Sequence, residues 1–232
     1  MKYVLKRQYR LRGWHKLPTG LYDSIKHEAQ FFSPDLYKLI LLCDAKHEID
    51  LDSLPEKHRR FIEDLNRENI IQSAGWPDGL LPEQRYKTYP ARYRHDATWS
   101  VTGECNMRCR HCFMSAPSGK HGSPTYEQIL SVADMLAECG VFRVGITGGE
   151  PLIRDDFIKI ADALYEREIS LTIIYTNGWL VDEKLLDELE KRDMHPEFQI
   201  SFDGVGWHDF LRGIPGAEER TIRALKLLNK RG

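Results

Sequence analysis

The chain has 232 residues, of which 41% are apolar and 29% are charged, and its formal net charge is −2. These values are typical of a globular protein with one large or two small domains, and they give no overall attraction for nucleic acid. No stretch approaches the ~18 apolar residues of a membrane span, and the charged start MKYVLKRQYRLR lacks the apolar core of a signal peptide. We therefore expect a cytoplasmic protein with no membrane partner.

Residues 1–75 are predicted to form a small module of strands and helices. YVLKRQYRLRGW, GLYDS and NIIQSA have the pattern of short strands. Ser33 and Pro34 predict the start of one helix, and Ser53 with Glu56 predicts a capping box at the start of another. The order of elements suggests an α+β, winged-helix-like module. Residues 76–96 are rich in proline, glycine and charge without an apolar period, which predicts a linker.

Residues 97–232 alternate between strand and helix patterns four times. The strands are ATWSVT, VFRVGIT, LTIIYT and EFQISF; the helices are TYEQILSVADMLAEC, DDFIKIADALYERE, DEKLLDELEKR and EERTIRALKLLNKR. Thr125 with Gln128 predicts the cap of the first helix. Such alternation predicts parallel βα units, whose strands carry ligand sites at their carboxyl ends. Those ends are TGECN, TGGEP, TNG and SFDG, so we expect one polar site there.

Three cysteines lie close together in the first of these loops, TGECNMRCRHCFM: Cys105, Cys109 and Cys112. In a reducing compartment, clustered thiols bind metal or do redox chemistry. A structural zinc site needs four ligands, and we expect Cys43 and Cys139 to serve packing instead. One face of a helix could also give this spacing, but Gly103 and Asn106 interrupt it. Three thiolates suit a 4Fe–4S cluster with one iron left open for another ligand.

These motifs together resemble the radical S-adenosylmethionine (SAM) superfamily. CNMRCRHC has the family spacing C-x-x-x-C-x-x-C, with His111 at a position that is often aromatic, and TGGEPLIRDDF and ISFDGVGWHDFLRG follow in the family order. The resemblance covers about residues 97–232. It implies a TIM-like barrel, which usually has six βα units. Because four are present, we expect a partial barrel, from a truncated chain or one completed by a partner.

The resemblance implies that the three cysteines hold the 4Fe–4S cluster and that SAM chelates the open iron. No catalytic side chain is expected, because the cofactors carry the chemistry. Gly148 and Gly149 are expected to let the backbone approach SAM, and Glu150 to accept a hydrogen bond from its ammonium group; the alternative is a turn with a surface glutamate. A side chain at Gly149 should then block SAM and spare the cluster. The further cofactor-binding candidates are Thr176, Asn177, Ser201, Asp203 and Arg212, each of which could instead belong to an ordinary turn or a surface salt bridge.

The SFDG to HDFLRG segment is similar to enzymes with a SPASM-type extension, and residues 1–75 resemble a module that binds leader peptides. The implied function is reductive cleavage of SAM and abstraction of hydrogen from a ribosomally made precursor peptide. The implied partners are that peptide and an electron donor such as flavodoxin or ferredoxin. Arg7, Arg10 and Arg12 would favour a peptide with an acidic leader segment. A tetrapyrrole or another small-molecule precursor is the alternative substrate. A non-catalytic iron–sulfur electron carrier or redox-responsive DNA binder is the alternative class, against which the GGEP loop argues.

Overall fold

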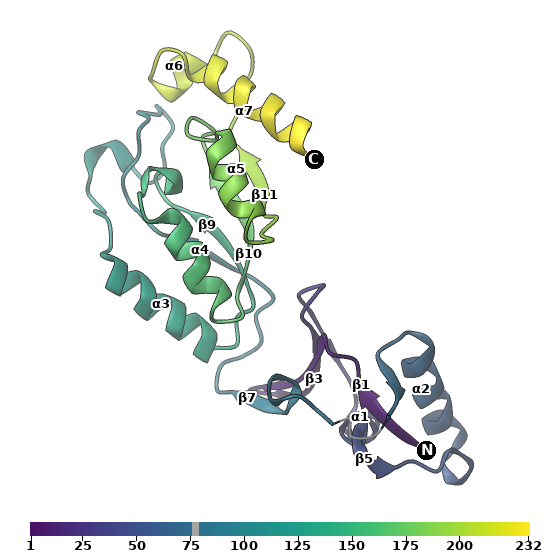
Figure 1. The fold of residues 1–232 in the computed structure, drawn as a ribbon. Coiled ribbons are helices and arrows are strands. Elements are labelled where there is room, and N and C mark those ends of the chain that lie inside the picture. Colours follow the sequence, from purple (N-terminus) through teal and green to yellow (C-terminus); the bar gives the residue numbers. More distant parts are fainter. Residues whose placement is uncertain (76–78) are drawn as a thin grey trace. The chain divides into compact units, whose positions relative to one another are not determined.

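The computed structural model describes residues 1–75 and 79–232, which form two compact units (Figure 1). The first contains the described part of Met1–His95 with Glu138–Gly140, and the second contains Asp96–Ala137 with Val141–Gly232. Residues 76–78, at the start of the predicted linker, lie outside the described part of the chain.

The N-terminal unit has two small sheets and two helices, as its strand and helix patterns indicate. One sheet has the order β5-β1-β6 and the other β4-β3-β2-β7. The elements are β1 (Lys2–Leu5), β2 (Tyr9–Trp14), β3 (Leu17–Asp23), β4 (Glu28–Phe31), α1 (Pro34–Leu41), β5 (Asp44–Glu48), α2 (Glu56–Arg67), β6 (Ile71–Ser73) and β7 (Lys87–Tyr89), with short 3-10 turns at Leu51–Ser53 and Pro82–Gln84. An α+β module is thus present, while the winged-helix assignment stays a prediction.

The structure confirms the predicted start of one helix of this unit and contradicts that of the other. Helix α1 begins as predicted, with Ser33 as N-cap and Pro34 in the first turn. The capping box predicted for α2 is wrong. Pro55 is the N-cap of α2, and the Ser53 hydroxyl donates instead to Asp50 O at 2.9 Å. A local 3-10 turn therefore uses the serine that the sequence pattern assigned to the helix.

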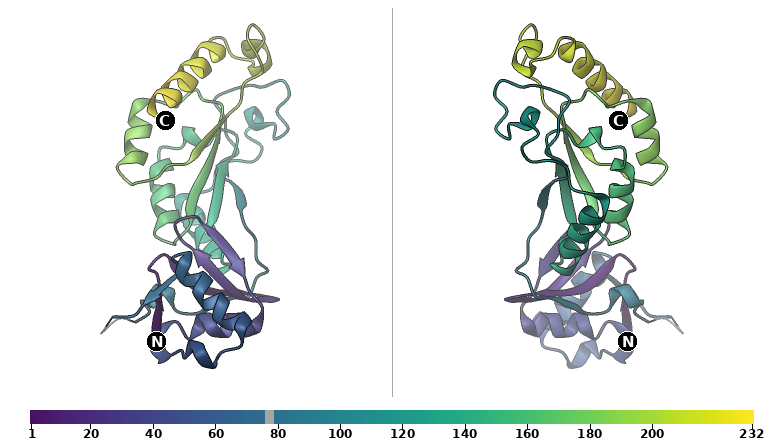
Figure 2. Two further views of the ribbon diagram at one scale, coloured as in Figure 1. Left: turned by 90° about the vertical axis from the view of Figure 1, so that its right-hand side faces the viewer. Right: turned by 90° about the vertical axis from the view of Figure 1, so that its left-hand side faces the viewer.

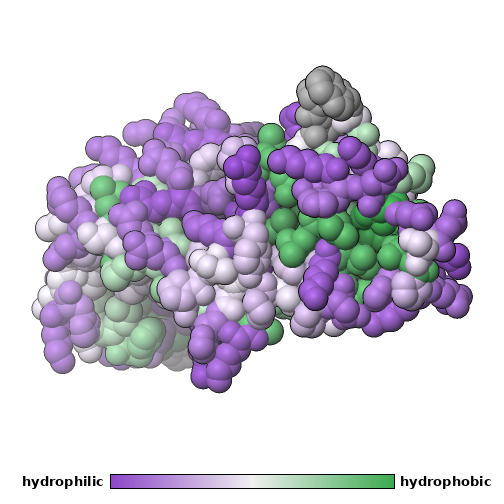
Figure 3. All heavy atoms as spheres, turned by 90° about the horizontal axis from the view of Figure 1, so that it is seen from below, coloured by the Kyte–Doolittle hydropathy of each residue, from purple (hydrophilic) through white to green (hydrophobic). Residues whose placement is uncertain are grey.

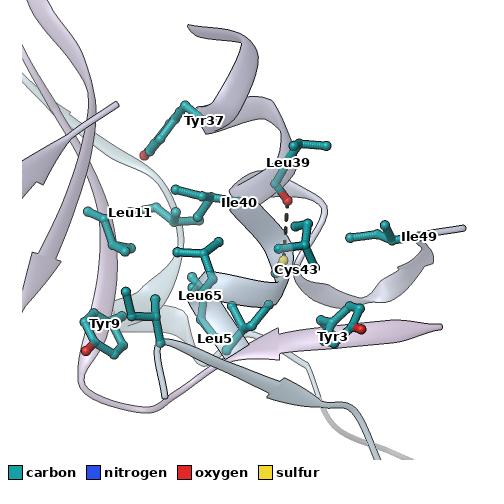
Figure 4. Packing of buried hydrophobic residues seen from close by; sticks show 14 residues of the cluster. Tyr3, Leu5, Tyr9, Leu11, Tyr37, Leu39, Ile40, Cys43, Ile49 and Leu65 are labelled. Carbon is teal, nitrogen blue, oxygen red and sulfur yellow. Dashed lines mark hydrogen bonds between the residues drawn. The ribbon is translucent and has the colours of Figure 1, made fainter. Parts of the chain in front are cut away.

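The core of the N-terminal unit lies between its helices and the strands β1, β2 and β3 (Figure 4). Ile40, Cys43 and Ile62 are completely buried in it. The Cys43 thiol donates to Leu39 O at 3.4 Å, and burial raises the pKa of this thiol to about 12. The packing role predicted for Cys43 is confirmed.

Part of the segment predicted as a linker is folded into this unit. Strand β7 runs parallel to β2, with Lys87 opposite Arg12. Gln84 is 1% exposed, and its side-chain amide donates to three backbone carbonyls of the N-terminal segment, those of Leu5, Lys6 and Tyr9. The linker prediction is therefore wrong for residues 82–89, because backbone pairing and one buried amide hold them without any apolar period.

The second unit is a parallel α/β sheet with the strand order β11-β10-β9-β8. Its elements are β8 (Ala97–Ser100), α3 (Tyr126–Glu138), β9 (Arg143–Thr147), α4 (Phe157–Tyr165), β10 (Ser170–Thr176), α5 (Glu183–Glu190), β11 (Glu197–Ile200), α6 (His208–Arg212) and α7 (Ala217–Arg231), with 3-10 turns at Ala116–Ser118 and Pro151–Ile153. Helices α3, α4 and α5 lie along one face of this sheet (Figures 1 and 2). Right-handed crossovers between sequential parallel strands require this arrangement.

The four predicted βα units are confirmed, and the core explains them. Val144, Ile146 and Ile174 are completely buried, together with Ile160 and Leu164 of α4. The four strands follow one another in chain order and run in the same direction, as the strands in part of a TIM-like barrel do. The sequence did not predict the short helix α6.

Two further sequence predictions concern helix α3 and its end. The capping box of α3 is confirmed: Thr125 N donates to Gln128 Oε1 at 2.9 Å, and Gln128 N to Thr125 Oγ1 at 3.3 Å. The packing role predicted for Cys139 is wrong, because this residue is exposed. Within residues 1–75 and 79–232, no helix is long and apolar enough to cross a membrane.

Candidate functional site

The three-cysteine loop connects β8 to α3 and is fixed by backbone hydrogen bonds from two distant segments. From the loop after β9, Gly149 N donates to Thr102 O at 2.9 Å, and Glu150 N donates to Glu104 O at 2.8 Å. From the other side, the amide of Arg108 donates to Arg212 O at 3.0 Å, and that of Arg110 to Leu211 O at 2.9 Å. Met107, 1% exposed, anchors the loop in the interior. The loop therefore has a defined shape without regular secondary structure.

Each sulfur atom of the loop faces a hydrogen-bond donor. Cys105 Sγ accepts from Met107 N at 3.4 Å, and Cys112 Sγ accepts from Ala116 N at 3.5 Å. Cys109 Sγ accepts from the Arg212 guanidinium, whose Nη1 lies 3.6 Å away. Donors of this kind stabilise thiolates, which are the form that binds iron.

The charges around the sulfur atoms fit a cationic group held by the loop. Burial raises the pKa of Cys105; the Met107 amide opposes this, and Glu150, Cys109 and Cys112 add to it through their negative charges. Thiolates that repel one another are stabilised by iron between them. Among the described residues, no three His, Cys, Asp or Glu side chains converge on a single-ion site. A cubane does not require such convergence, because each thiolate binds a different iron.

Gly148 and Gly149 lie against the backbone of the cysteine loop. A Cβ on Gly148 would lie 2.5 Å from Thr102 O, and one on Gly149 would lie 2.1 Å from Glu104 O. Both residues must therefore be glycine for the two loops to approach each other. Their predicted contact with SAM stays a proposal, whereas this steric requirement is a property of the fold.

Glu150 is completely buried, and its side chain links the ends of β9 and β10. Its Oε1 accepts from Thr176 Oγ1 at 2.8 Å and from Leu152 N at 3.1 Å, and its Oε2 accepts from Asn177 N at 2.7 Å. Burial raises the pKa of this carboxyl group, while the donors at Asn177, Thr176 and Leu152 oppose the shift. The alternative of a surface glutamate is thereby excluded. Three of the roughly four lone-pair sites of the carboxylate are used, which leaves one for a ligand.

Thr176 and Asn177, both predicted site residues, are buried beside Glu150 at the end of β10. The Asn177 side-chain amide donates to Asn106 Oδ1 at 2.7 Å and lies 3.9 Å from Cys105 Sγ. The structure therefore brings Glu150, Thr176, Asn177 and the first cysteine together, as the strand-end argument predicts.

The candidates at the fourth strand end form an ion pair. Arg212 Nη2 donates to Asp203 Oδ1 at 3.2 Å, and Nε lies 2.8 Å from Oδ2 in a close contact without hydrogen-bond geometry. Asp203 Oδ1 is also 3.9 Å from His111 Nε2. Ser201 is partly buried, and its amide donates to Thr176 O at 3.1 Å. Ligand roles for Ser201, Asp203 and Arg212 stay proposals.

His208, which the sequence predicts to shape this loop rather than to do chemistry, is also part of this network. It is completely buried, and its Nδ1 accepts from Asp203 N at 3.1 Å. Its Nε2 must then carry the proton and donate to Thr221 Oγ1 at 3.2 Å, which in turn donates to Asn177 O at 3.1 Å. Burial, followed by the nearby Arg212 charge, lowers the pKa of His208 and favours this neutral form. A histidine and an aspartate next to each other after a strand end are a faint signal, and a contact over thirteen residues to Thr221 cannot be predicted from local pattern.

The fold and this loop define a parallel α/β protein with a three-thiol site at its strand ends. The sequence model of the radical SAM superfamily matches residues 99–232, and the chain belongs to that superfamily. The cofactors of the family are a 4Fe–4S cluster and SAM. The pair of cofactors that the sequence motifs predict is therefore confirmed.

Several curated proteins are similar to this chain over a little more than half of its length. The chain is 32% identical to the antilisterial bacteriocin subtilosin biosynthesis protein AlbA of Bacillus subtilis over 138 residues, which are 59% of this chain and 31% of that protein. It is 33% identical to the AdoMet-dependent heme synthase of Methanosarcina barkeri over 57% of this chain and 38% of that protein. It is 32% identical to the mycofactocin maturase MftC of Mycobacterium tuberculosis over 58% of this chain and 34% of that protein. The chain spans about a third of the length of these relatives.

A solved structure resembles both units. Streptococcus suis SuiB bound to S-adenosylmethionine matches 98% of this chain and 54% of its own, with a TM-score of 0.61 and 18% sequence identity. SuiB bound to its precursor peptide SuiA matches with a TM-score of 0.60 at 16% identity. At such identities the similarity concerns the fold.

Proposed function

We propose that the chain is the cluster-binding and peptide-recognising part of a radical SAM enzyme that matures a ribosomally made peptide. Cys105, Cys109 and Cys112 hold the cluster, which supplies one electron to SAM when both are bound. Glu150, Thr176 and Asn177 hold the strand ends beside the first cysteine, where SAM binds. A cytoplasmic location and a flavodoxin or ferredoxin as electron donor belong to this proposal.

The observation that carries the proposal is the N-terminal unit. Curated relatives with different products match little more than half of this chain, and they include a heme synthase and a bacteriocin biosynthesis protein. SuiB, by contrast, has a fold that matches 98% of this chain, N-terminal unit included, and SuiB has been crystallised with a precursor peptide. Peptide recognition therefore accounts for both units of this chain.

The N-terminal unit offers an extended peptide both an edge and a groove. Strand β4 lies at the edge of its sheet. A groove of about 440 Å³ lies beside Leu36 of α1 and Phe61 of α2, and four charged side chains of α2 also line it: Glu56, Lys57, Arg60 and Asp64. The ring centroids of Phe61 and of Phe32, which directly follows β4, are 5.6 Å apart. Figure 3 shows hydrophobic surface bordered by hydrophilic side chains on this unit. A leader strand added to β4 can place its apolar side chains in the groove.

Two of the three arginines predicted to select an acidic leader already make hydrogen bonds within the N-terminal unit. Arg12 is 2% exposed, and its guanidinium donates to Arg85 O and Glu83 O. Arg10 donates to Ser24 Oγ at 2.8 Å. The prediction is wrong for Arg12, because backbone carbonyls surround it. Strand pairing and contacts in the groove, rather than Arg12, then supply the affinity for a leader.

The cluster assignment is tested by anaerobic reconstitution of the full chain. We expect about four irons per chain, formation of 5′-deoxyadenosine from SAM with dithionite as reductant, and loss of both in the triple variant of Cys105, Cys109 and Cys112 to alanine. Cys139→Ala is the matched control, because this cysteine is exposed and lies outside the loop. Full iron content in the triple variant would contradict the assignment.

Peptide recognition is tested by titrating the full chain with peptides encoded by short reading frames beside its gene and with random duplex DNA, each at two salt concentrations. We expect one peptide to bind with little salt dependence and Leu36→Asp to weaken it at least tenfold. Leu41→Asp, the same change at an exposed site of the same helix, should not. Tight binding of DNA that falls steeply with salt, without any peptide binding, would favour the DNA-binding alternative.

A tetrapyrrole or another small molecule is the second candidate substrate. The 33% identity to a heme synthase favours it. This candidate predicts that SAM cleavage responds to a porphyrin precursor and is unaffected by Leu36→Asp, which distinguishes it from the peptide proposal.

A further inference from the structure

Arg212 contacts a cluster ligand and an acidic partner at the same time. Its Nη1 donates to Cys109 Sγ at 3.6 Å, and its Nη2 and Nε face the two carboxylate oxygens of Asp203. The side chains of Arg212 and Asp203 are 11% and 18% exposed. The charge-assisted hydrogen bond from Nη2 to Oδ1, with Nε close to the second oxygen, restricts the direction of the guanidinium.

The pair is in turn held by a chain of hydrogen bonds that ends at the strand carrying Asn177. His208 accepts from the Asp203 amide and donates to Thr221, which donates to Asn177 O. His208 and Thr221 are both completely buried, and each is hydrogen-bonded on both sides. The chain therefore sets the position of Asp203 relative to the sheet, and through Asp203 the position of Arg212.

We propose that Asp203 and His208 are positioning residues that hold Arg212 against the Cys109 thiolate, and that this contact raises the reduction potential of the cluster. The inference rests on the proposed function, since it requires the cluster on this loop. Reduction adds one electron, from a low-potential carrier protein or a chemical reductant, and changes the cluster from the 2+ to the 1+ state with no proton transferred. A cationic donor at a ligand sulfur stabilises the more negative, reduced state.

The two other arginines of the loop make different contacts. Arg110 stands directly after Cys109, but its Nε donates to Phe210 O at 3.0 Å and its guanidinium stacks on the Phe210 ring at 4.1 Å. Arg108 is fixed through its backbone amide, which donates to Arg212 O. Arg110→Gln therefore removes the same charge close to the cluster without removing a donor from a sulfur atom, and it is the matched control.

The test is a redox titration of the reconstituted full chain without SAM, followed by electron paramagnetic resonance. We expect Arg212→Gln to lower the ratio of reduced to oxidised cluster at least tenfold at a fixed potential, which is 59 mV for one electron. Arg110→Gln should change it far less. An Arg212→Gln shift no larger than that of Arg110→Gln overturns the proposal. Iron content is measured first, so that loss of the cluster in the unmodified chain counts against the proposed function instead.

The positioning residues have a test that depends on the sign of the shift. Loss of the Asp203 charge alone would ease reduction, whereas loss of its hold on Arg212 makes reduction harder. We expect Asp203→Asn to lower the potential and the neutral change His208→Gln to lower it by less. In the Arg212→Gln background, neither should add a further decrease. A rise in Asp203→Asn, or full additivity, would overturn the positioning role, and Arg212→Lys carries the test if Arg212→Gln does not fold.

Discussion

Replacement of Gly149 by alanine should disturb the cysteine loop itself. The added Cβ would lie 2.1 Å from Glu104 O, whereas real Cβ atoms essentially never approach another atom closer than 3.0 Å, so one of the two loops must move by about 0.9 Å. The movement strains the hydrogen bonds from Gly149 N to Thr102 O and from Glu150 N to Glu104 O. Loss of a buried hydrogen bond costs ~1–3 kcal/mol and overpacking costs ~1–3 kcal/mol, so we expect a loss of ~2–6 kcal/mol in the free energy of unfolding.

The assay is urea unfolding of the apo chain, followed by circular dichroism, together with iron content after reconstitution. We expect Gly149→Ala to lower the unfolding midpoint and the iron content, which revises the expectation that a side chain here would block SAM and spare the cluster. Gly79→Ala is the control, because among the described residues, its chain neighbours apart, no atom lies within 4 Å of its Cβ position. Equal midpoints and equal iron content in the two variants would refute the reasoning.

Three further predictions concern single side chains. Glu150→Gln places an amide N–H against backbone donors such as Asn177 N, so we expect a loss of ~1–3 kcal/mol in urea unfolding; unchanged stability would mean that these donors find other acceptors. Asp209 accepts from Gly216 N and Glu218 N, and these bonds lower its pKa, so its contribution to stability is present above the unfolded pKa of about 3.9 and is lost as pH falls through the folded pKa. Asp209→Asn should flatten the pH dependence of stability in that acidic range, and an identical pH profile would argue against it. Iodoacetamide at pH 8 should label Cys139 in the native chain and spare Cys43, whose pKa is about 12; mass spectrometry checks this, and labelling of Cys43 before unfolding would contradict its burial.

The fold of the C-terminal unit was predictable because its signals are local. Strands such as LTIIYT are nearly continuous apolar runs, and the cap of α3 is formed by residues three positions apart. The three cysteines are likewise close in sequence. Parallel βα order then places the four strand ends at one edge, so Glu150, Thr176 and Asn177 could be expected to lie together before their contacts were known.

Long-range polar contacts could not be predicted. Nothing around Arg12 or Gln84 indicates that each would be buried against backbone carbonyls more than seventy residues away. The same holds for Arg212, whose two partners lie 9 and 103 residues away in the sequence. Single polar side chains that satisfy buried carbonyls or thiolates leave no periodic pattern, and propensity arguments therefore assign such residues to the surface.

The bonds between the cysteine loop and α6 have a consequence for the lifetime of bound iron. The amides of Arg108 and Arg110 are held by the carbonyls of Arg212 and Leu211, so the loop can open on this side only when residues 211–212 separate from it. Local opening of this kind sets the rate at which a chelator reaches metal ligands. A change that slows hydrogen exchange at these two amides should therefore also slow the loss of iron to a chelator. This is expected although both residues lie in a loop without regular secondary structure. The stability of a five-residue helix would then govern how long the site keeps its metal in the presence of a competitor.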